Sequence, residues 1–549
     1  MALPQVSTAQ AFVEIYPFEG GSYTISGQQA NLLGLSVTNG VVGITPGKFS
    51  MQIAPGGPNG VNGSPLWTEI VTPMSLVVIG LSRAGRQNIV MVGVVLSAVE
   101  TTTWVSGRGA QRAVQIDGQD FGYIFNSQLL YLQTYLLMSN LAGLPSPAIV
   151  DQFGAGLLEG APDKVAAAWF DIVMAGSKGV VSGLNFAYQT SRLSFSSLMS
   201  TFFEAYPGST YIPYSTNFLS SDGSWASKFD SILPAPFYET FVTTSPINYY
   251  NTGGVAGGMN GTTISMAALP KAPPVTPVLI GRVNPFPSLY YDINSKDPSH
   301  MSLDMTRWDV LPVSYPDNSG FINSQIALDV GEVRNFFVIN PIGISNNFGG
   351  SNSQTTPFMF QHAAFFIPSS IHRYGLRPLI AELEWFNDPT GGQAQQVASS
   401  NGGYQAYEDL VTALALKQVS FFTPLGLMRR AVVTTEMRPD IMPGTRYRYA
   451  PHKDGVTWEF YVETVTHTYN FGGICTTTLG LSRGLPKSTY DNPQVMLDIH
   501  LGNAMLQNGN YVSGLPSGVT GSLTTVNAES IGAGVLGQLA GLFNMPQGQ

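Results

Sequence analysis

Residues 457–482 decide the fold. They read Thr-Trp-Glu-Phe-Tyr-Val-Glu-Thr-Val-Thr-His-Thr-Tyr-Asn-Phe-Gly-Gly-Ile-Cys-Thr-Thr-Thr-Leu-Gly-Leu-Ser. Trp458, Phe460 and Val462 alternate with Glu459 and further polar positions, and a period of two places the apolar side chains on one face of a β-strand. A Gly-Gly pair then turns the chain, and the Thr-rich sequence after it favours a second strand. The stretch therefore predicts an antiparallel hairpin with one buried face.

Further elements precede this hairpin in the same block. Residues 431–435 and 446–449 are rich in β-branched and aromatic side chains, which pack well on a pleated surface. A stripe of apolar side chains at helical spacing begins near Tyr404 and is interrupted by Gln418. We therefore expect a helix followed by a small antiparallel β-barrel over residues 404–490.

Residues 1–125 also read as strands. Segments 74–81 and 89–96 are rich in Val and Ile, and Arg83-Ala-Gly-Arg86 between them supplies a charged turn that contains a glycine. Residues 48–54 alternate between inward and outward positions, as a half-buried strand does. This block is expected to form a first small antiparallel barrel or sandwich.

The region between the two blocks has a different pattern. Residues 126–250 are expected to be mainly helical, with helices over 126–141, 162–176 and 195–206. Residues 251–403 are expected to form a mixed β and loop domain. The predicted fold class is thus mainly β with α+β insertions, in which two small antiparallel β-barrel domains flank a mixed helical and loop region.

Long linkers and an unusual C-terminal segment complete the division. Gly-, Pro- or Ser-rich linkers are expected over residues 251–262, 270–277, 345–357 and 388–403. Residues 491–549 form a C-terminal extension, in which Glu529 is the only charged side chain after position 500. We expect so uncharged a segment to pack on a partner chain, and the alternative is a poorly ordered terminus.

The composition excludes several classes of protein. Charged residues make up 11% of the 549 residues, against about 25% in an average soluble domain. The scarcity of Glu, Lys and Arg excludes a coiled coil. The 30 Phe, 24 Tyr and 7 Trp can bury a large core, which excludes a disordered chain. The formal net charge is −9 and no basic run exceeds Arg429-Arg430, so tight binding of DNA or RNA is not expected.

The single cysteine and the hydropathy pattern bear on location. Cys475 alone cannot build an intrachain disulfide framework or a cysteine-based metal site. The N-terminal residues lack a basic region followed by an apolar run, and no stretch of about 18 apolar residues appears anywhere. We therefore expect no secretory signal and no membrane span, and a chain that is made and folded in a cytoplasm.

One short pattern resembles the site of a catalytic serine, but the residues after it differ from those that such a site requires. Gly480-Leu-Ser-Arg-Gly484 matches the G-x-S-x-G elbow of serine hydrolases, which needs a helix directly after the serine. Here a Leu-Pro pair follows the glycine, and His500 comes only 18 residues after Ser482 with no suitable acid in the expected order. A turn at a strand end is the favoured interpretation of Ser482.

Two glycine-rich stretches resemble phosphate loops only loosely. Gly43-Ile-Thr-Pro-Gly-Lys48 is one residue short of the P-loop spacing, and Phe49 replaces the Ser or Thr that would hold magnesium. Gly154-Ala-Gly-Leu-Leu-Glu-Gly160 is one residue too long for a dinucleotide fingerprint. Both are interpreted as turn glycines.

Histidines and carboxylates do not form a recognisable site. None of the six histidines lies four residues from another, as a helical zinc site would require. His467 falls on the Glu463 face of its predicted strand, where a cross-strand hydrogen bond is a better hypothesis than a metal. We therefore predict no catalytic, cofactor-binding or metal-ligating residues, no cofactor and no enzymatic activity.

Two sets of motifs, one in each block, resemble a known family. The first set is Phe49-Ser-Met-Gln-Ile53, Trp67-Thr-Glu-Ile-Val-Thr-Pro73, Val92-Gly-Val-Val95 and Ala113-Val-Gln-Ile-Asp-Gly-Gln-Asp-Phe121. The second set is Met437-Arg-Pro-Asp-Ile-Met-Pro-Gly444, Phe460-Tyr-Val-Glu-Thr-Val-Thr-His467, Tyr469-Asn-Phe-Gly-Gly473 and Thr476-Thr-Thr-Leu-Gly-Leu-Ser-Arg-Gly-Leu-Pro486. In this order they resemble the two barrels of tailed-phage baseplate hub proteins, the central hub family of contractile tails and related injection machines. Residues 126–400 resemble no pattern in that family.

The resemblance implies a structural protein of the virion. Three copies of such a hub form a ring, and each copy supplies two tube-type β-barrels, so the homotrimer adapts a hexameric tail tube to a threefold central spike. The implied partners are the tail tube protein, the central spike protein, the tape measure protein and other baseplate proteins. Genome DNA passes through the ring during ejection without specific binding. The implied location is the tail baseplate, assembled in the host cytoplasm.

Two other functions stay open at this point. A virion fibre or receptor-binding protein would also be rich in strands, although the sequence lacks the fixed-period repeats typical of fibres. A hub with a cell-wall hydrolase activity in its middle region is the second alternative. The low charge and the abundance of Ser, Thr, Asn and Gln favour the hub, because Lys or Arg in the wall of a DNA channel would hold phosphates.

Overall fold

The computed structural model describes most of the two strand-rich blocks and parts of the region between them. The described residues are 9–17, 21–27, 31–58 except 42 and 44, 65–105, 109–130 except 128, 187–191, 223–244, 277–291, 301–316, 321–341, 364–383, 414–451, 455–517, 519 and 524–526. The helices predicted over 162–176 and 195–206, most of the helix over 126–141, the four linkers except residue 277, and the loop at Gly154 lie outside them. Within the predicted helix over 126–141, Leu129–Leu130 instead form the short strand β8, because they pair with residues 223–224.

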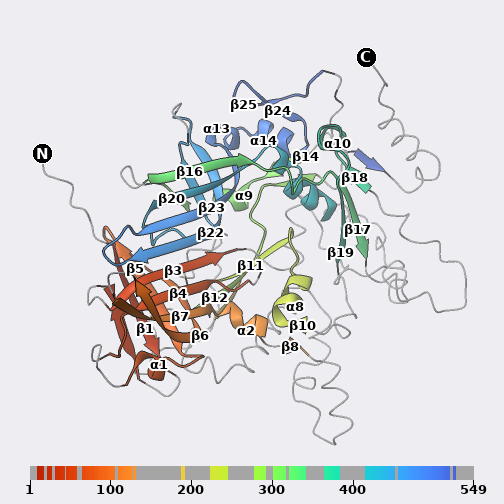
Figure 1. Ribbon diagram of the computed structural model, residues 1–549. Helices are drawn as coiled ribbons and strands as arrows, with labels where there is room; N and C mark the ends of the chain where they lie inside the picture. Colours follow the sequence, from red (N-terminus) through yellow and green to blue (C-terminus); the bar gives the residue numbers. More distant parts are fainter. Residues whose placement is uncertain are drawn as a thin grey trace, which may run out of the picture.

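One large, almost entirely antiparallel sheet of thirteen strands joins both blocks (Figure 1). Its strands run in the order β16-β20-β23-β22-β3-β4-β7-β6-β5-β1-β2, with β21 beside β22 and β15 beside β21. Their bounds are β1 Gln10–Tyr16, β2 Tyr23–Ser26, β3 Leu32–Gly40, β4 Lys48–Ile53, β5 Leu76–Arg83, β6 Arg86–Val105, β7 Gly109–Asp120, β15 Val313–Ser314, β16 Phe321–Leu328, β20 Arg429–Glu436, β21 Arg446–Tyr449, β22 Trp458–Asn470 and β23 Thr476–Pro486. The predicted fold class, mainly β with insertions, is confirmed.

The first block curls around its own core. β5 and β6 form the predicted hairpin, and its turn places Ala84 and Gly85 at positive φ. The central residues of β5 are buried on both faces, as their continuous apolarity predicts. Strands β1 to β7 and the short helix α1 (Trp67–Ile70) enclose a core that includes Val13, Met51 and Trp67.

The second block is built from β20 to β23. β22 and β23 form the hairpin that residues 457–482 predict, with Gly472 at positive φ in the turn. Phe460, Val465 and Leu479 are buried in a separate core below this sheet. Residues 414–422, in the predicted helical stripe, are α-helical.

The central strands of the two blocks have the same topology, although the antiparallel β1 borders β5 in the first block and the parallel β15 borders β21 in the second. In the first, β4 pairs with β7, β7 with β6 and β6 with β5. In the second, β20 pairs with β23, β23 with β22 and β22 with β21. An additional antiparallel strand borders each set, β3 beside β4 and β16 beside β20. A short helix follows the last strand in both, α2 (Gly122–Ser127) and α13 (Lys487–Tyr490).

Two β-bulges in the first block have counterparts in the second. Leu96 is skipped in the pairing of β6 with β7, and Glu463 is skipped in the pairing of β22 with β23. Leu33 is skipped between β3 and β4, and Ile322 between β16 and β20. Because these bulges occupy corresponding strands and registers, the blocks are two versions of one module. We call residues 10–127 the first module. The second module consists of strands β15, β16 and β20–β23, which lie within residues 313–490.

A single long strand joins the modules. The first part of β22 pairs with β21, whereas residues 464–470 pair with residues 34–40 of β3. These seven residue pairs make the sheet continuous, and we call them the seam. The two modules, which the mixed region separates in the sequence, are therefore joined edge to edge in the sheet.

Smaller elements cover the second module. A third core, which contains Phe241, Trp308 and Met496, packs against Tyr461 and Leu485 on the face of the second module opposite Phe460. The remaining described elements are β8 Leu129–Leu130, β9 Ala187–Ser191, β10 Gly223–Ser224, α8 Trp225–Ile232, β11 Tyr238–Thr243, β12 Val278–Val283, β13 Ser288–Tyr291, β14 Met301–Asp304, α9 Thr306–Asp309, β17 Phe336–Pro341, β18 Ala364–Phe366, α10 Pro368–Tyr374, β19 Pro378–Leu383, η9 Pro424–Gly426, α14 Pro493–His500, β24 Ala504–Gln507, β25 Asn510–Ser513 and β26 Thr524–Val526.

The described part of the C-terminal extension packs on its own chain. β24 and β25 form a hairpin, and the Tyr511 hydroxyl donates to the carbonyl of Leu427 at 2.6 Å. β26 pairs with β18. Residues 527–549 lie outside the described part of the structure, so the expectation that the extension packs on a partner chain stays a prediction for them.

Candidate functional site: the polar face of the shared sheet

One face of the continuous sheet is lined mostly by uncharged side chains. It runs without interruption over the eight neighbouring strands from β16 to β6 and crosses the seam (Figure 1). We call it the polar face, and the strand registers place on it Asn323, Gln325, Ala327, Arg430, Val432, Thr434, Glu436, Thr476, Thr478, Gly480, Thr464, Thr466, Thr468, Ser36, Thr38, Gly40, Lys48, Ser50, Gln52, Gln115, Asp117, Gln119, Ser97, Val99 and Thr101. The opposite face of the same strands is buried in the two module cores.

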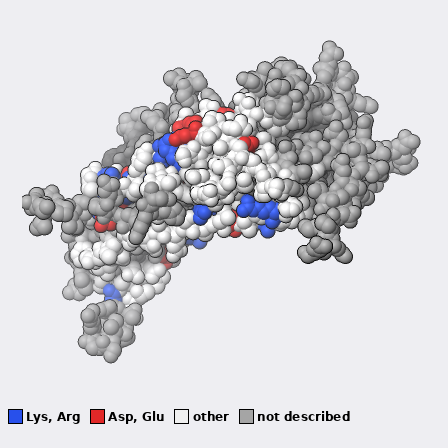
Figure 2. All heavy atoms as spheres, turned by 90° about the horizontal axis from the view of Figure 1, so that it is seen from above, with Lys and Arg blue, Asp and Glu red and all other residues white. Residues whose placement is uncertain are grey.

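Charge on the polar face is sparse and balanced. The basic side chains on it are Lys48 and Arg430, and the acidic ones are Asp117 and Glu436. Arg430 forms ion pairs with Asp329 and Glu332, and Glu436 forms one with Arg83. Figure 2 likewise shows one side of the molecule on which charged residues gather in a few small patches and the rest of the described surface is uncharged. The face therefore offers little attraction to an anion such as phosphate.

Threonine hydroxyls tie the polar face together across strands. Thr38 Oγ1 lies 3.0 Å from Thr466 Oγ1 across the seam, and Thr434 Oγ1 lies 3.3 Å from Thr478 Oγ1 within the second module. Cross-strand Thr pairs of this kind stabilise a sheet while keeping its surface neutral. The alternating threonines of β22 and β23 are visible in the sequence, but only the strand register shows that they share one face with β3.

The bulge at Glu463 corrects the predicted position of His467. The strand alternation puts His467 on the Glu463 face, but skipping one residue inverts the alternation, so His467 lies on the same side as Val462 and Val465. It is buried, and its Nδ1 lies 2.9 Å from Thr477 Oγ1, which is the predicted cross-strand hydrogen bond. Burial lowers the pKa of this imidazole to about 4.

A buried carboxyl holds the end of β7. Asp120 accepts hydrogen bonds from the backbone N–H groups of Gly47 and Gly122, each at 2.8 Å. Burial raises the pKa of Asp120 to about 7, although both N–H donors favour its ionised form. A Cβ on Gly47 would lie 2.7 Å from this carboxyl, so the close approach requires glycine. Asp120 thereby fixes the loop that leads into β4.

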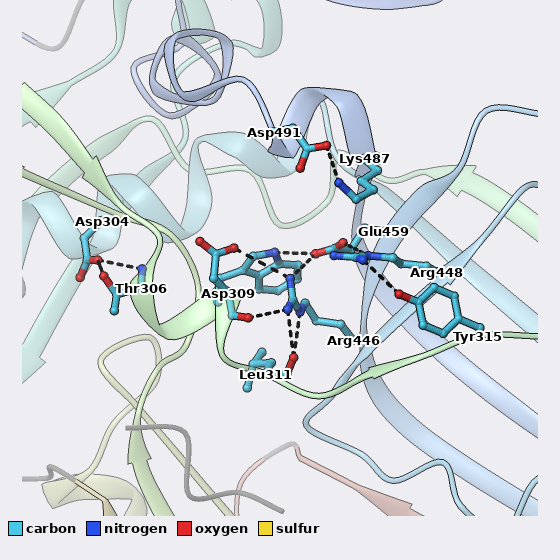
Figure 3. A network of polar contacts seen from close by, with 11 residues as sticks. Asp304, Thr306, Asp309, Leu311, Tyr315, Arg446, Arg448, Glu459, Lys487 and Asp491 are labelled. Atoms are coloured by element: carbon cyan, nitrogen blue, oxygen red, sulfur yellow. Dashed lines mark hydrogen bonds and ion pairs between the residues drawn. The ribbon is translucent and has the colours of Figure 1, made fainter. Parts of the chain in front are cut away.

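A buried ion network fastens residues 305–315 to the second module (Figure 3). Glu459 accepts hydrogen bonds from Trp308 Nε1 and from Arg446 Nη1, both at 2.8 Å, and it also pairs with Arg448. Arg446 donates further to the carbonyls of Asp309 and Leu311. Because Glu459 is 1% exposed, these partners replace the water that would otherwise solvate its carboxylate.

A second buried cluster fastens β11 and β12 to the same strand. Arg282 donates to Glu239 at 2.7 Å, to the Tyr461 hydroxyl at 2.9 Å and to the carbonyl of Gly444 at 3.0 Å. Tyr461 in turn donates to Glu239. Burial raises the pKa of Tyr461 well above its usual range. In both clusters each charged side chain forms an ion pair or hydrogen bond with another member, and these contacts fasten the covering elements to β22.

The residues considered from the sequence for catalysis do not come together. Ser482 lies within β23 opposite Tyr461, and its buried hydroxyl has no hydrogen-bond partner among the described residues. Its place inside a strand differs from the strand–turn–helix elbow of a hydrolase. His500 is buried in α14, where its Nδ1 lies 2.8 Å from the carbonyl of Met496. Lys48 is the first residue of β4 rather than part of a loop.

The described part of the chain shows no metal site and no membrane helix. No group of three or more His, Cys, Asp or Glu in it is arranged to hold a metal ion. Within the same residues, no helix has the length and apolarity needed to cross a bilayer. Sequence reasoning missed the two buried ion clusters, because their members are separated by up to 222 positions and meet only in the folded chain.

Solved structures of phage tail proteins are similar to this chain at low sequence identity. A tail protein from Neisseria meningitidis MC58 is 9% identical, with 86% of this chain and 96% of that chain covered and a TM-score of 0.40. The 43 kDa tail protein of prophage MuSo2 from Shewanella oneidensis is 9% identical, with 87% and 99% covered and a TM-score of 0.38. Prophage tail protein gp18 from Listeria monocytogenes EGD-e is 8% identical, with 89% and 96% covered and a TM-score of 0.35. No protein-family model and no curated protein sequence matches the chain.

Proposed function

We propose that this chain is the structural hub of a phage tail baseplate. Three copies form a ring that adapts a hexameric tail tube to a threefold central spike, and the polar face lines the channel through which the genome passes. The repeated module is the single observation that carries this proposal. Two modules whose central strands share one topology become six similar units when three copies close a ring.

The chemistry of the polar face suits a DNA channel. A duplex is densely charged, and each Lys or Arg that neutralises a phosphate strengthens its binding through counterion release. A wall of Thr, Ser and Gln with two basic and two acidic side chains offers hydrogen-bonding groups with little of that attraction. DNA would therefore move past this surface without being held.

The dimensions of such a ring also suit a channel. Each copy would contribute the eight strands from β16 to β6. About twenty-four strands at a spacing of about 4.8 Å give a closed ring about 37 Å across its backbone, and strand tilt widens it further. Barrels of about 16–18 strands already enclose an aqueous channel.

The remaining partners follow from this placement. One rim of the ring would receive the tail tube protein, and the other the central spike protein. Residues 527–549 would contact the tape measure protein or the spike, and the elements around β11 and β17 would contact other baseplate proteins. In this role the chain is a virion component, assembled in the host cytoplasm, and acts without catalysis.

Mass and shape test the proposal directly. Native mass spectrometry of the purified full chain should give a particle of three times 58.8 kDa. Negative-stain images should show a ring with a central hole that admits a duplex. A compact monomer at all concentrations, or a ring with a closed centre, would contradict the hub function.

A further inference from the structure

Besides the short strands β2 and β15, which each pair with one neighbour, the large sheet has two longer strand edges without a partner in the described part of the chain. Beyond the bulge at Leu96, the half of β6 from Ser97 onward pairs with β7 on one side only. β16 pairs with β20 on one side only. Such edges present rows of N–H and C=O groups that can accept another strand.

The same edges are paired where the two modules meet. In the second module, the corresponding half of β22, residues 464–470, is covered by β3 of the first module. β3 itself corresponds to β16, since β3 borders β4, β16 borders the matching strand β20, and both have a bulge at the same register. The seam therefore shows how the counterpart of β16, which is β3, pairs with the counterpart of the second half of β6, which is residues 464–470 of β22.

We propose that β16 of one copy pairs in antiparallel register with the second half of β6 in a second copy, repeating the seam between chains. This rests on the ring proposed above and names the surfaces that close it. Each of the resulting interfaces would be a strand-to-strand contact, and the eight strands from β16 to β6 would continue from copy to copy around the ring.

The coincident bulges fix the register of the new contact. After the bulge, Thr464 and Thr466 of β22 correspond to Ser97 and Val99 of β6. Thr38 of β3 lies opposite Thr466. Thr38 also pairs with Lys48 of β4, just as Ala327 of β16 pairs with Arg430 at the matching position of β20, so Thr38 corresponds to Ala327. Ala327 of one copy should therefore lie opposite Val99 of the next. By the same count, Leu328 lies opposite Ala98 and Gln325 opposite Thr101.

Exposed apolar side chains favour this pairing. Val99 is 52% exposed and Leu328 is 47% exposed, although both lie in regular strands. Leu328 shares the core-facing side of β16 with Ile326, and Ala98 packs against the core of the first module. In the proposed register Leu328 would extend the neighbour's core beside Ala98. Burial of such side chains stabilises a contact that the backbone hydrogen bonds orient.

A disulfide trap tests the register. In a Cys475→Ser background, Val99→Cys and Ala327→Cys would be combined, because directly opposed residues of antiparallel strands have Cα atoms about 4.5–5.5 Å apart, within disulfide range. The matched control combines Ala98→Cys with Ala327→Cys, whose side chains would point to opposite faces. Mild oxidation should join the first variant into covalent trimers on a non-reducing gel and leave the control at least tenfold less cross-linked.

The outcomes separate this proposal from the hub function. A trimeric mass without the cross-link would overturn the strand pairing and leave the ring standing. Cross-linking by Ala327→Cys alone would show that β16 pairs with itself, which also overturns the proposal. A protein that stays monomeric would contradict both the ring and the pairing.

Discussion

The Thr38 hydroxyl lies 3.0 Å from the Thr466 hydroxyl, although the two residues are 428 positions apart in the chain. They meet because β3 and β22 pair over seven residues and turn two modules into one sheet. The seam makes the first module depend on a strand of the second, and the polar face depends on both.

Tyr469 should be required for the stability of the first module. Its ring belongs to β22, but it is buried in the core of the first module. Tyr469→Ala should lower the free energy of unfolding by about 3 kcal/mol, as removal of a buried aromatic ring does. Urea unfolding followed by circular dichroism measures this. Thr468→Ala on the polar face is the control and should change it by about 0.5 kcal/mol or less.

His467 should make the protein sensitive to acid. Its pKa is lowered to about 4 in the folded state, against about 6.5 when unfolded. A group with a depressed folded pKa contributes stability that is present above pH 6.5 and is lost as pH falls toward 4. Between pH 7 and pH 5 the loss should be about 2 kcal/mol. His467→Gln should remove it, so equal pH slopes in the two proteins would contradict the assignment.

Glu459 should be needed to hold residues 305–315 on the second module. Glu459→Ala would leave the buried Arg446 and Trp308 without their acceptor and should cost about 3–5 kcal/mol. Glu463→Ala removes a half-buried carboxylate of the same strand and should cost about 0.5 kcal/mol or less. Thermal unfolding of both variants distinguishes a network that fastens the segment from a general loss of negative charge.

Lysines on the polar face should create DNA affinity that the natural face lacks. Thr466→Lys with Thr478→Lys places two cations on neighbouring strands facing the proposed channel. Binding of duplex DNA should strengthen, and the slope of log affinity against log salt should steepen by about 0.9 for each phosphate contacted. Thr466→Gln with Thr478→Gln is the neutral control. If the lysine variant bound no more DNA than the control, the polar face would not line a DNA path.

Charge at the proposed interchain contact should control assembly. Val99→Lys with Ala327→Lys would place like charges directly opposite each other and should shift the trimer toward monomers. Val99→Lys with Ala327→Glu should restore the trimer, since the charges become complementary. Sedimentation velocity measures the trimer fraction of both variants. Added salt should narrow the difference between their trimer fractions, because screening weakens exposed charge pairs. Equal trimer fractions in both would exclude this contact.

Local pattern predicted more of the fold than of the site. The hairpins at residues 76–94 and 458–486 follow from alternation, β-branched runs and turn glycines, all of which act between near neighbours. The bulge at Glu463 does not follow, because one skipped residue is defined only against the partner strand. His467 was therefore placed on the wrong face, while its hydrogen bond to a neighbouring strand was predicted correctly.

The seam and the buried ion clusters lay beyond sequence reasoning for a related reason. Glu459 reads as a solvent-facing position of an alternating strand, but Trp308 and Arg446 cover it from other elements. Nothing in the neighbouring residues specifies which distant segment will do so. The threonine pattern of the polar face was visible in each strand, whereas its continuation onto β3 required the pairing of strands 428 positions apart.

The sharing of β22 between the modules has a mechanical consequence. A force that slides one module past the other along the strands must shear all seven residue pairs of the seam together. A force perpendicular to the strands peels the same pairs apart one after another. The joint is therefore stiffest along its own strands, and a stress applied in that direction at either module is passed on to the other.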